Sequence, residues 1–173
     1  MVLFDYRLDI ENPLENCGLL SKDLGVILID MQKDFVQGIY PVNHKQKILQ
    51  CQINVFNECI RKDIPVVVLE SLNHGKTIDC LMEKINAVPR GRVITKTKSS
   101  GFSNIDFEIQ LSHFEIRQLF LMGLYASYCI KETAEDAIKR GMKVYVSKSV
   151  IGKKHYHTQD MNKTWYDFHC SFF

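Results

Sequence analysis

The chain has 173 residues, of which 46% are apolar and 24% are charged, and its formal net charge at pH 7 is +2. This profile is typical of one ordinary globular domain, so we expect a single domain over residues 1–173. The basic residues are scattered, which argues against a nucleic-acid groove or an anionic membrane patch, and neither partner is expected. Residues 1–13 lack the uninterrupted apolar core of a signal peptide or a membrane span.

The cysteines indicate a reducing compartment rather than a disulfide framework. They stand at positions 17, 51, 59, 80, 129 and 170, and none forms a C-x-x-C pair. We therefore expect a cytoplasmic protein. A metal site built from His155, His157 and the His169-Cys170 pair lacks a second matching ligand pair, and no metal is predicted.

Strands and helices alternate along the chain. Residues 1–23 show no clean period and predict an irregular lead-in with a break at Pro13. Strands are predicted over residues 24–29, 65–70, 93–95, 118–122 and 143–147. Helices are predicted over residues 44–62, 104–112 and 127–140. Such alternation predicts an α/β fold with a mostly parallel sheet and helices on both of its faces.

The stretch from Phe120 to Ala134 contains a buried strand, a turn with Gly123 and a helix whose first turn carries Cys129. A thiol at a helix N-terminus feels the positive end of the helix dipole, which favours the thiolate. The alternative is that Cys129 is one more small residue of the core.

Three predicted strands are each followed by a residue whose side chain can take part in catalysis. These residues are Asp30, Lys96 and, one turn further on, Cys129. The carboxyl ends of parallel strands share one edge, so we expect these side chains to converge. Cys129 would be the nucleophile, Asp30 would take its proton and pass it to a leaving amine, and Lys96 would supply positive charge. Backbone N–H groups around Tyr125 and Cys129 would hold the oxyanion. The alternative for Asp30 is a capping role in the next turn.

Three blocks of residues carry a family resemblance. They are Leu28-Ile29-Asp30-Met31-Gln32-x-Asp34-Phe35, then Val93-Ile94-x-Lys96 with Phe102, then Gly123-(x5)-Cys129-Ile130-x-x-Thr133-Ala134-x-Asp136-Ala137-(x3)-Gly141. In this order and spacing they resemble the isochorismatase-like cysteine hydrolases, a superfamily with isochorismatases, nicotinamidases and N-carbamoylsarcosine amidohydrolases. The resemblance covers residues 24–147. It implies a three-layer α/β/α fold with a mostly parallel, five- to six-stranded sheet, and assembly as a homo-oligomer.

The resemblance also implies a catalytic triad of Asp30, Lys96 and Cys129 that hydrolyses C–N bonds of small amides or ureido compounds through a thioester. It implies a cis peptide bond between Leu124 and Tyr125, which would aim backbone amides at the oxyanion. Lys98 is the rival for Lys96, but the step from Lys96 to Phe102 matches the family. No cofactor is implied.

Two departures from the family narrow this prediction. Nicotinamidases of the family carry an Asp-x-His metal site after the second strand, whereas this chain has Ser71-Leu72-Asn73-His74, with leucine in the place of the aspartate. The region after Val150 is also short, so an edge strand is expected to be missing, abbreviated or supplied by a partner. The aromatic residues of this region are expected to pack or to contact another subunit, and they are Tyr156, Trp165, Phe168, Phe172 and Phe173.

The sequence thus predicts a cysteine amidohydrolase acting on a small molecule, with pocket walls at Phe35, Phe102, Tyr125 and Tyr128 that are otherwise ordinary core residues. One alternative is an isochorismatase-type vinyl-ether hydrolase, although such relatives lack the nucleophilic cysteine. Others are a catalytically idle scaffold or oligomer partner, and a redox sensor at Cys129, which lacks a resolving cysteine nearby in the sequence. The substrate itself is not predicted.

Overall fold

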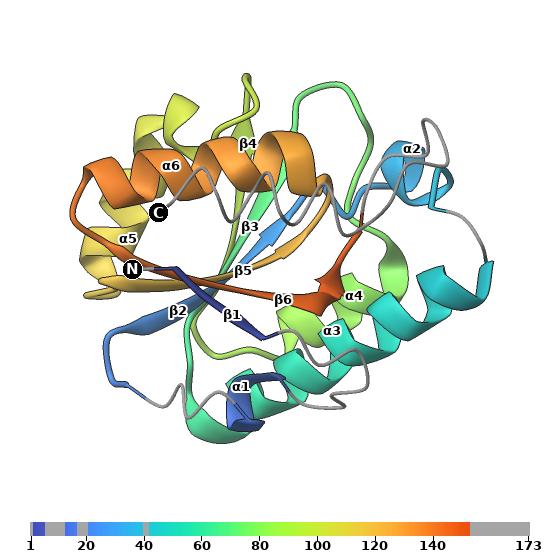
Figure 1. Cartoon of the computed structure of the whole chain (residues 1–173), viewed down its shortest axis with the longest axis horizontal. Helices are drawn as coiled ribbons and strands as arrows, with labels where there is room; N and C mark the ends of the chain where they lie inside the picture. The colour runs from blue at the N-terminus through green and yellow to red at the C-terminus, as the bar shows by residue number, and fades with distance from the viewer. Residues whose placement is uncertain (1, 6–12, 17–20, 40–41, 153–173) are drawn as a thin grey trace.

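The fold is built on one parallel sheet with helices on both faces (Figure 1). The computed structural model describes residues 2–5, 13–16, 21–39 and 42–152. The strands of this part are β1 (Val2–Asp5), β2 (Leu24–Ile29), β3 (Val66–Ser71), β4 (Gly91–Lys96), β5 (Gln118–Gly123) and β6 (Lys143–Ile151). Their order across the sheet is β1-β6-β5-β2-β3-β4, and every pairing is parallel. The predicted α/β class and parallel sheet are confirmed.

The central strands are the most apolar part of the chain. Every residue of β2 is buried, and β3 and β5 each have one partly exposed terminal residue. Strands covered on both faces need no alternation of polar and apolar residues, and this explains their continuous apolar runs. These runs made the three strands predictable.

The expectation of an irregular lead-in over residues 1–23 is wrong at its start. Val2–Asp5 forms β1, an edge strand that pairs with β6 in parallel from Val144 to Ser147. A four-residue strand is too short to show a period, and its partner lies about 140 residues away along the chain. The aromatic residues after Val150, from Tyr156 onward, lie outside the described residues.

Two strands extend by more than one residue beyond their predicted ranges, for different reasons. β4 is the other edge of the sheet, and its exposed residues Arg92 and Thr95 interrupt the apolar pattern. β6 continues to Ile151 through Ser147 and Ser149, which are buried. Their hydroxyls lie 2.9 Å apart and hydrogen-bond to each other, which offsets the cost of burying them.

The helices lie in two layers. Figure 1 shows α5 (Ile105–His113) and α6 (Lys131–Lys139) on one face of the sheet, and α1 (Pro13–Asn16), α3 (Val42–Lys62) and α4 (Asp79–Asn86) on the other. The short α2 (Lys33–Val36) follows β2. The predicted helices over 44–62 and 104–112 correspond to α3 and α5. The short α1, α2 and α4 were not predicted.

The predicted helix over 127–140 is divided into two parts. Ala126–Ile130 forms a π-helical turn, η2, and α6 follows it directly. Gly141 has a φ of 76°, so it occupies the left-handed C-terminal position expected for a glycine. None of the helices in the described ranges has the length and hydrophobicity needed to cross a membrane.

Candidate active site

Three polar side chains meet beyond the carboxyl ends of β2, β4 and β5. The ammonium nitrogen of Lys96 lies 3.0 Å from Oδ2 of Asp30 and 3.5 Å from Sγ of Cys129. Asp30 follows β2, Lys96 ends β4 and Cys129 lies in η2 after β5. The structure therefore brings together the three residues that the sequence singled out, and parallel topology is the reason.

Asp30 is held at the end of β2 in an unusual backbone conformation. Its φ is 55°, in the left-handed region that aspartate tolerates better than most residues. Its backbone N–H donates to the carbonyl of Leu69 at 3.0 Å, so the chain is still tied to β3 at this point. The side chain is only 1% exposed. A carboxylate buried this deeply requires partners that compensate its charge.

Lys96 supplies that compensation. Its side chain is fully buried, and its ammonium forms an ion pair with Asp30 Oδ2. The ammonium donates three hydrogen bonds, to Ser71 Oγ at 2.9 Å, to the backbone carbonyl of Lys98 at 3.2 Å and to Cys129 Sγ at 3.5 Å. The side chain of Lys98 is exposed. Burial and contacts therefore favour Lys96 over its rival Lys98, which takes part only through its backbone.

The surroundings of Cys129 favour the neutral thiol over the thiolate. Burial, followed by the negative charge of Asp30, raises the pKa of Cys129 to about 12, and Lys96 only partly opposes this. The sequence predicts that the helix dipole favours the thiolate, but in the structure burial and a neighbouring carboxylate outweigh any such effect. A thiol beside a carboxylate has a base nearby that can accept its proton.

The turn between β5 and η2 is tightly enclosed. The peptide bond between Leu124 and Tyr125 is cis, and Gly123 has a φ of 124°. A Cβ atom on Gly123 would lie 2.0 Å from the carbonyl oxygen of Ile29, so only glycine fits against β2. Leu124 N–H donates to that same carbonyl at 2.8 Å. These contacts set where the helical turn with Cys129 begins.

Aromatic residues line one side of this turn. The hydroxyl of Tyr125 donates to the carbonyl of Phe35 at 3.3 Å, and the two rings meet edge to face with centroids 5.8 Å apart. The ring of His74 lies 4.5 Å from that of Phe35, and its Nδ1 is 3.7 Å from Oδ2 of Asp34. Tyr128 is 57% exposed. Their roles as pocket walls stay predictions.

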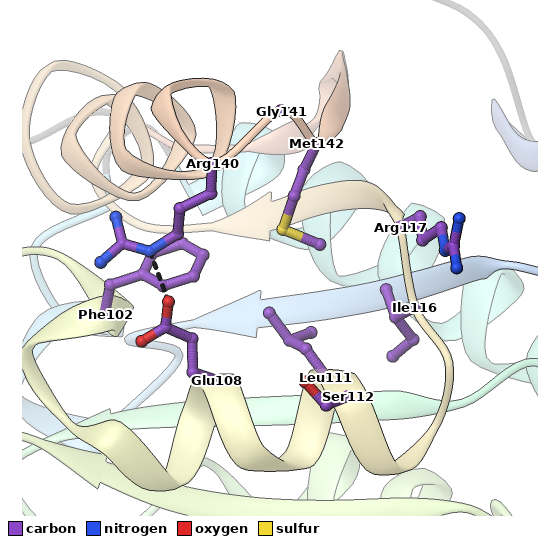
Figure 2. A pocket seen from close by; sticks show the side chains of 9 residues that line it. All are labelled: Phe102, Glu108, Leu111, Ser112, Ile116, Arg117, Arg140, Gly141 and Met142. Carbon is purple, nitrogen blue, oxygen red and sulfur yellow. Dashed lines mark hydrogen bonds and ion pairs between the residues drawn. The ribbon is translucent and has the colours of Figure 1, made fainter.

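Phe102 lines a cleft other than the site that contains Cys129. Its ring packs 4.9 Å from that of Phe107 and 4.3 Å below the guanidinium of Arg140, which pairs with Glu108. This cleft of about 410 Å³ lies between α5 and α6. Figure 2 shows Phe102 and Arg140 at one end of this cleft, with Met142 along its wall. The contacts of Phe102 thus belong to this cleft, and its predicted role at the substrate pocket stays a prediction.

The described residues contain no group of three His, Cys, Asp or Glu side chains arranged to hold a metal ion. His74, the remaining residue of the family's metal motif, faces Phe35 and Asp34 instead. The second candidate, His155 with His157, lies outside the described residues.

Sequence reasoning missed Ser71 as a member of this site. Its hydroxyl lies 2.8 Å from Asp30 Oδ1 and 2.9 Å from Lys96 Nζ. The available signal was its position as the last residue of β3, the strand that lies between β2 and β4. In the sequence it stood out only as the first residue of a degenerate metal motif.

The parallel sheet of this protein carries a carboxylate, an ammonium and a thiol at its carboxyl edge. Proteins with this fold and these three side chains form a class, because cysteine hydrolases use such a set. Comparison with known families narrows this class. The isochorismatase domain model matches residues 25–164, and the chain belongs to the isochorismatase family.

Two curated relatives have names that describe an activity. Streptothricin hydrolase of Streptomyces noursei is 25% identical over 126 residues, which are 69% of this chain and 50% of that protein. N-carbamoylsarcosine amidase of Arthrobacter sp is 29% identical over 91 residues, 53% of this chain and 33% of that protein. The matches thus span half or less of the length of these curated relatives.

Solved structures share the fold. The nicotinamidase of Staphylococcus aureus superposes with a TM-score of 0.72 at 19% identity, covering 88% of this chain and 94% of that one. At this level of identity the likeness shows the α/β architecture alone.

Proposed function

We propose that this protein is a hydrolase that cleaves a C–N bond of a small amide or ureido compound, with Cys129 as the nucleophile. The observation that supports this most is the position of the Lys96 ammonium, 3.0 Å from the carboxylate of Asp30 and 3.5 Å from the sulfur of Cys129. The names of the two relatives, a hydrolase and an amidase, agree with this class of reaction.

In the first step the neutral thiol attacks the substrate's carbonyl carbon. The C–S bond forms while the S–H proton passes to the carboxylate of Asp30, and the carbonyl electron pair moves onto oxygen. Negative charge therefore moves from Asp30 to the substrate oxygen. Lys96, in contact with both Asp30 and Cys129, keeps a positive charge beside the reacting groups throughout.

Collapse of this intermediate breaks the C–N bond, and the leaving nitrogen takes the proton from Asp30. The acyl group stays on Cys129 as a thioester. A water molecule then attacks the thioester carbon and gives a proton to Asp30. When the C–S bond breaks, Asp30 returns that proton to the sulfur, so one water is consumed and one acid and one amine are formed.

The oxyanion of each intermediate needs hydrogen-bond donors. We assign this role to the backbone N–H groups of Tyr125 and Cys129, which border the turn with the cis peptide bond. In other hydrolases the loss of one such donor costs about 3 kcal/mol of transition-state stabilisation.

Acyl transfer is tested by intact-protein mass spectrometry and by amine release. The protein is incubated with primary amides, N-carbamoyl amino acids and a vinyl ether. With an accepted amide we expect an adduct on Cys129 whose mass lacks the leaving amine, and no adduct or amine release in Cys129→Ala. The matched control is Cys80→Ala, because Cys80 is an exposed cysteine of α4.

The other outcomes identify the alternatives. Cleavage of the vinyl ether that persists in Cys129→Ala would replace the proposal with an isochorismatase-type hydrolase. A folded protein that neither turns over nor forms an adduct with any member of the panel would support a scaffold role. Assembly as a homo-oligomer stays a prediction.

A further inference from the structure

Ser71 closes a ring of polar contacts around the acidic and basic groups of the site. It ends β3, which lies between β2 and β4, and its register partner on β4 is Lys96. Its Oγ lies 2.8 Å from Asp30 Oδ1 and 2.9 Å from Lys96 Nζ, and that nitrogen lies 3.0 Å from Asp30 Oδ2. Each of the three side chains therefore contacts the other two.

The chemistry of the donors sets the direction of every hydrogen bond in this ring. An ammonium has three donors and no acceptor, so the Ser71 hydroxyl must accept from Lys96. The single hydroxyl proton is then committed to Oδ1 of Asp30. Among the described residues Oδ2 accepts no well-directed hydrogen bond and has the Lys96 ammonium as its charged neighbour. One carboxylate oxygen is thus occupied by the hydroxyl, and the other is left to receive a proton.

A buried amide fixes the position of Ser71 itself. The side chain of Gln32 is fully buried, accepts from the backbone N–H of Ser71 at 2.7 Å and donates to the backbone carbonyl of Ser71 at 2.9 Å. Its second amide proton goes to the carbonyl of Gly75 at 2.7 Å. Gln32 follows Asp30 by two residues, so the backbone around Ser71 is tied to the segment that carries the carboxylate.

We propose that Ser71 is a positioning residue of this site, whose hydroxyl binds Oδ1 of Asp30 and the ammonium of Lys96 so that Oδ2 faces the thiol of Cys129. The proposal rests on the proposed function. No proton leaves Ser71 during the reaction. Without the hydroxyl, the carboxylate loses the bond that fixes its rotation, and Lys96 loses one of its acceptors.

The test is alkylation of Cys129 by iodoacetamide, measured on its peptide by mass spectrometry between about pH 6 and pH 9. The charged side chains that act on the thiol are Asp30, through its negative charge, and Lys96, whose ammonium lies 3.5 Å from the sulfur. A thiol beside a carboxylate and a thiolate beside a carboxylic acid hold the same number of protons. If the proton passes from Cys129 to Asp30 before alkylation, the alkylation rate of Cys129 therefore does not change with pH. The rate at the exposed Cys80, the internal control, should increase with pH.

Removal of the hydroxyl should lower this pH-independent rate. We expect Ser71→Ala to reduce it about tenfold, the effect of losing one hydrogen bond to a charged group. Ser71→Thr keeps a hydroxyl and should stay within about threefold of the wild type, whereas Ser71→Val has nearly the shape of threonine and should lose as much as alanine. Ser147→Ala removes a buried hydroxyl that bonds the hydroxyl and the backbone N–H of Ser149, away from the candidate site, and it should leave the rate unchanged.

The outcomes separate this inference from the proposed function. If Asp30→Asn has the same pH-independent rate as the wild type, Asp30 is not the base, and both the function and the inference fail. If the rate depends on Asp30 but is unchanged in Ser71→Ala, only the inference fails. Equal rates in Ser71→Thr and Ser71→Val would also overturn it, and this comparison remains decisive if the alanine variant does not fold.

Discussion

The contribution of the ion pair between Lys96 and Asp30 to the free energy of unfolding can be measured directly by mutation. Lys96→Met removes the ammonium but keeps a side chain of similar length and apolar stem. The carboxylate of Asp30, which is 1% exposed, then loses its counter-charge, and Ser71 loses a hydrogen-bond donor. Asp30→Asn produces the complementary defect, a buried ammonium without its carboxylate.

The cost of each single change follows from burial. Breaking a buried ion pair on one side typically costs 3–5 kcal/mol, because an uncompensated charge stays behind, so we expect about 3 kcal/mol or more for Lys96→Met. Removing both charges leaves no unpaired charge in the core. The double variant with Lys96→Met and Asp30→Asn should therefore be about 2 kcal/mol more stable than the sum of the two single losses predicts. The partly exposed ion pair of Lys131 with Glu135 serves as the surface control, and Lys131→Met should cost at most about 1 kcal/mol.

The assay is urea unfolding at neutral pH, followed by circular dichroism, for the four members of the cycle and for the control. Two results would refute the reasoning. One is a loss below about 1 kcal/mol in Lys96→Met, equal to that of the surface control. The other is a double variant whose loss equals the sum of the single losses, which would mean that the two charges do not interact.

Three further predictions concern the thiol and its supporting turn. Titration of the thiolate by ultraviolet absorbance should show no step from Cys129 below about pH 10, since its pKa is raised to about 12, and Asp30→Asn should lower that pKa by removing a negative charge; an unchanged titration would contradict this. Gly123→Ala should cost about 3 kcal/mol or more in urea unfolding because its Cβ would collide with Ile29, whereas Gly75→Ala, with open space around it, should cost about 1 kcal/mol; similar losses would contradict the collision. Thr133→Val should cost about 1–3 kcal/mol in the same assay, since its buried hydroxyl accepts from Gly101 N–H and donates to the carbonyl of Cys129; a loss near zero would contradict that role.

The central strands were predictable because their signal is local. The run from Leu24 to Ile29 is apolar throughout, and such a run is the direct consequence of helices on both faces of a parallel sheet. β1 has no such signal, because Val2–Asp5 is a strand only through its pairing with a segment at the far end of the described chain. Pairing between distant segments is invisible to any local window.

Three members of the site were predictable from the sequence, but Ser71 and the electrostatics of the site were not. Asp30, Lys96 and Cys129 stand where the sequence places the carboxyl ends of parallel strands, so their convergence follows from topology. The charge state of Cys129 does not follow from its place near a helix N-terminus. It depends on how deeply the sulfur is buried and on the carboxylate beside it, both of which arise from packing.

The sequence by itself determined the fold class, the family and three residues of the candidate site, because apolar runs and motif spacing are properties of short segments. Only the tertiary structure decided that Lys96 rather than Lys98 is buried, that Ser71 joins the site, and that the surroundings of Cys129 favour the neutral thiol. Each of these depends on distances between residues on different strands and on the exclusion of water, and these exist only once the sheet has formed.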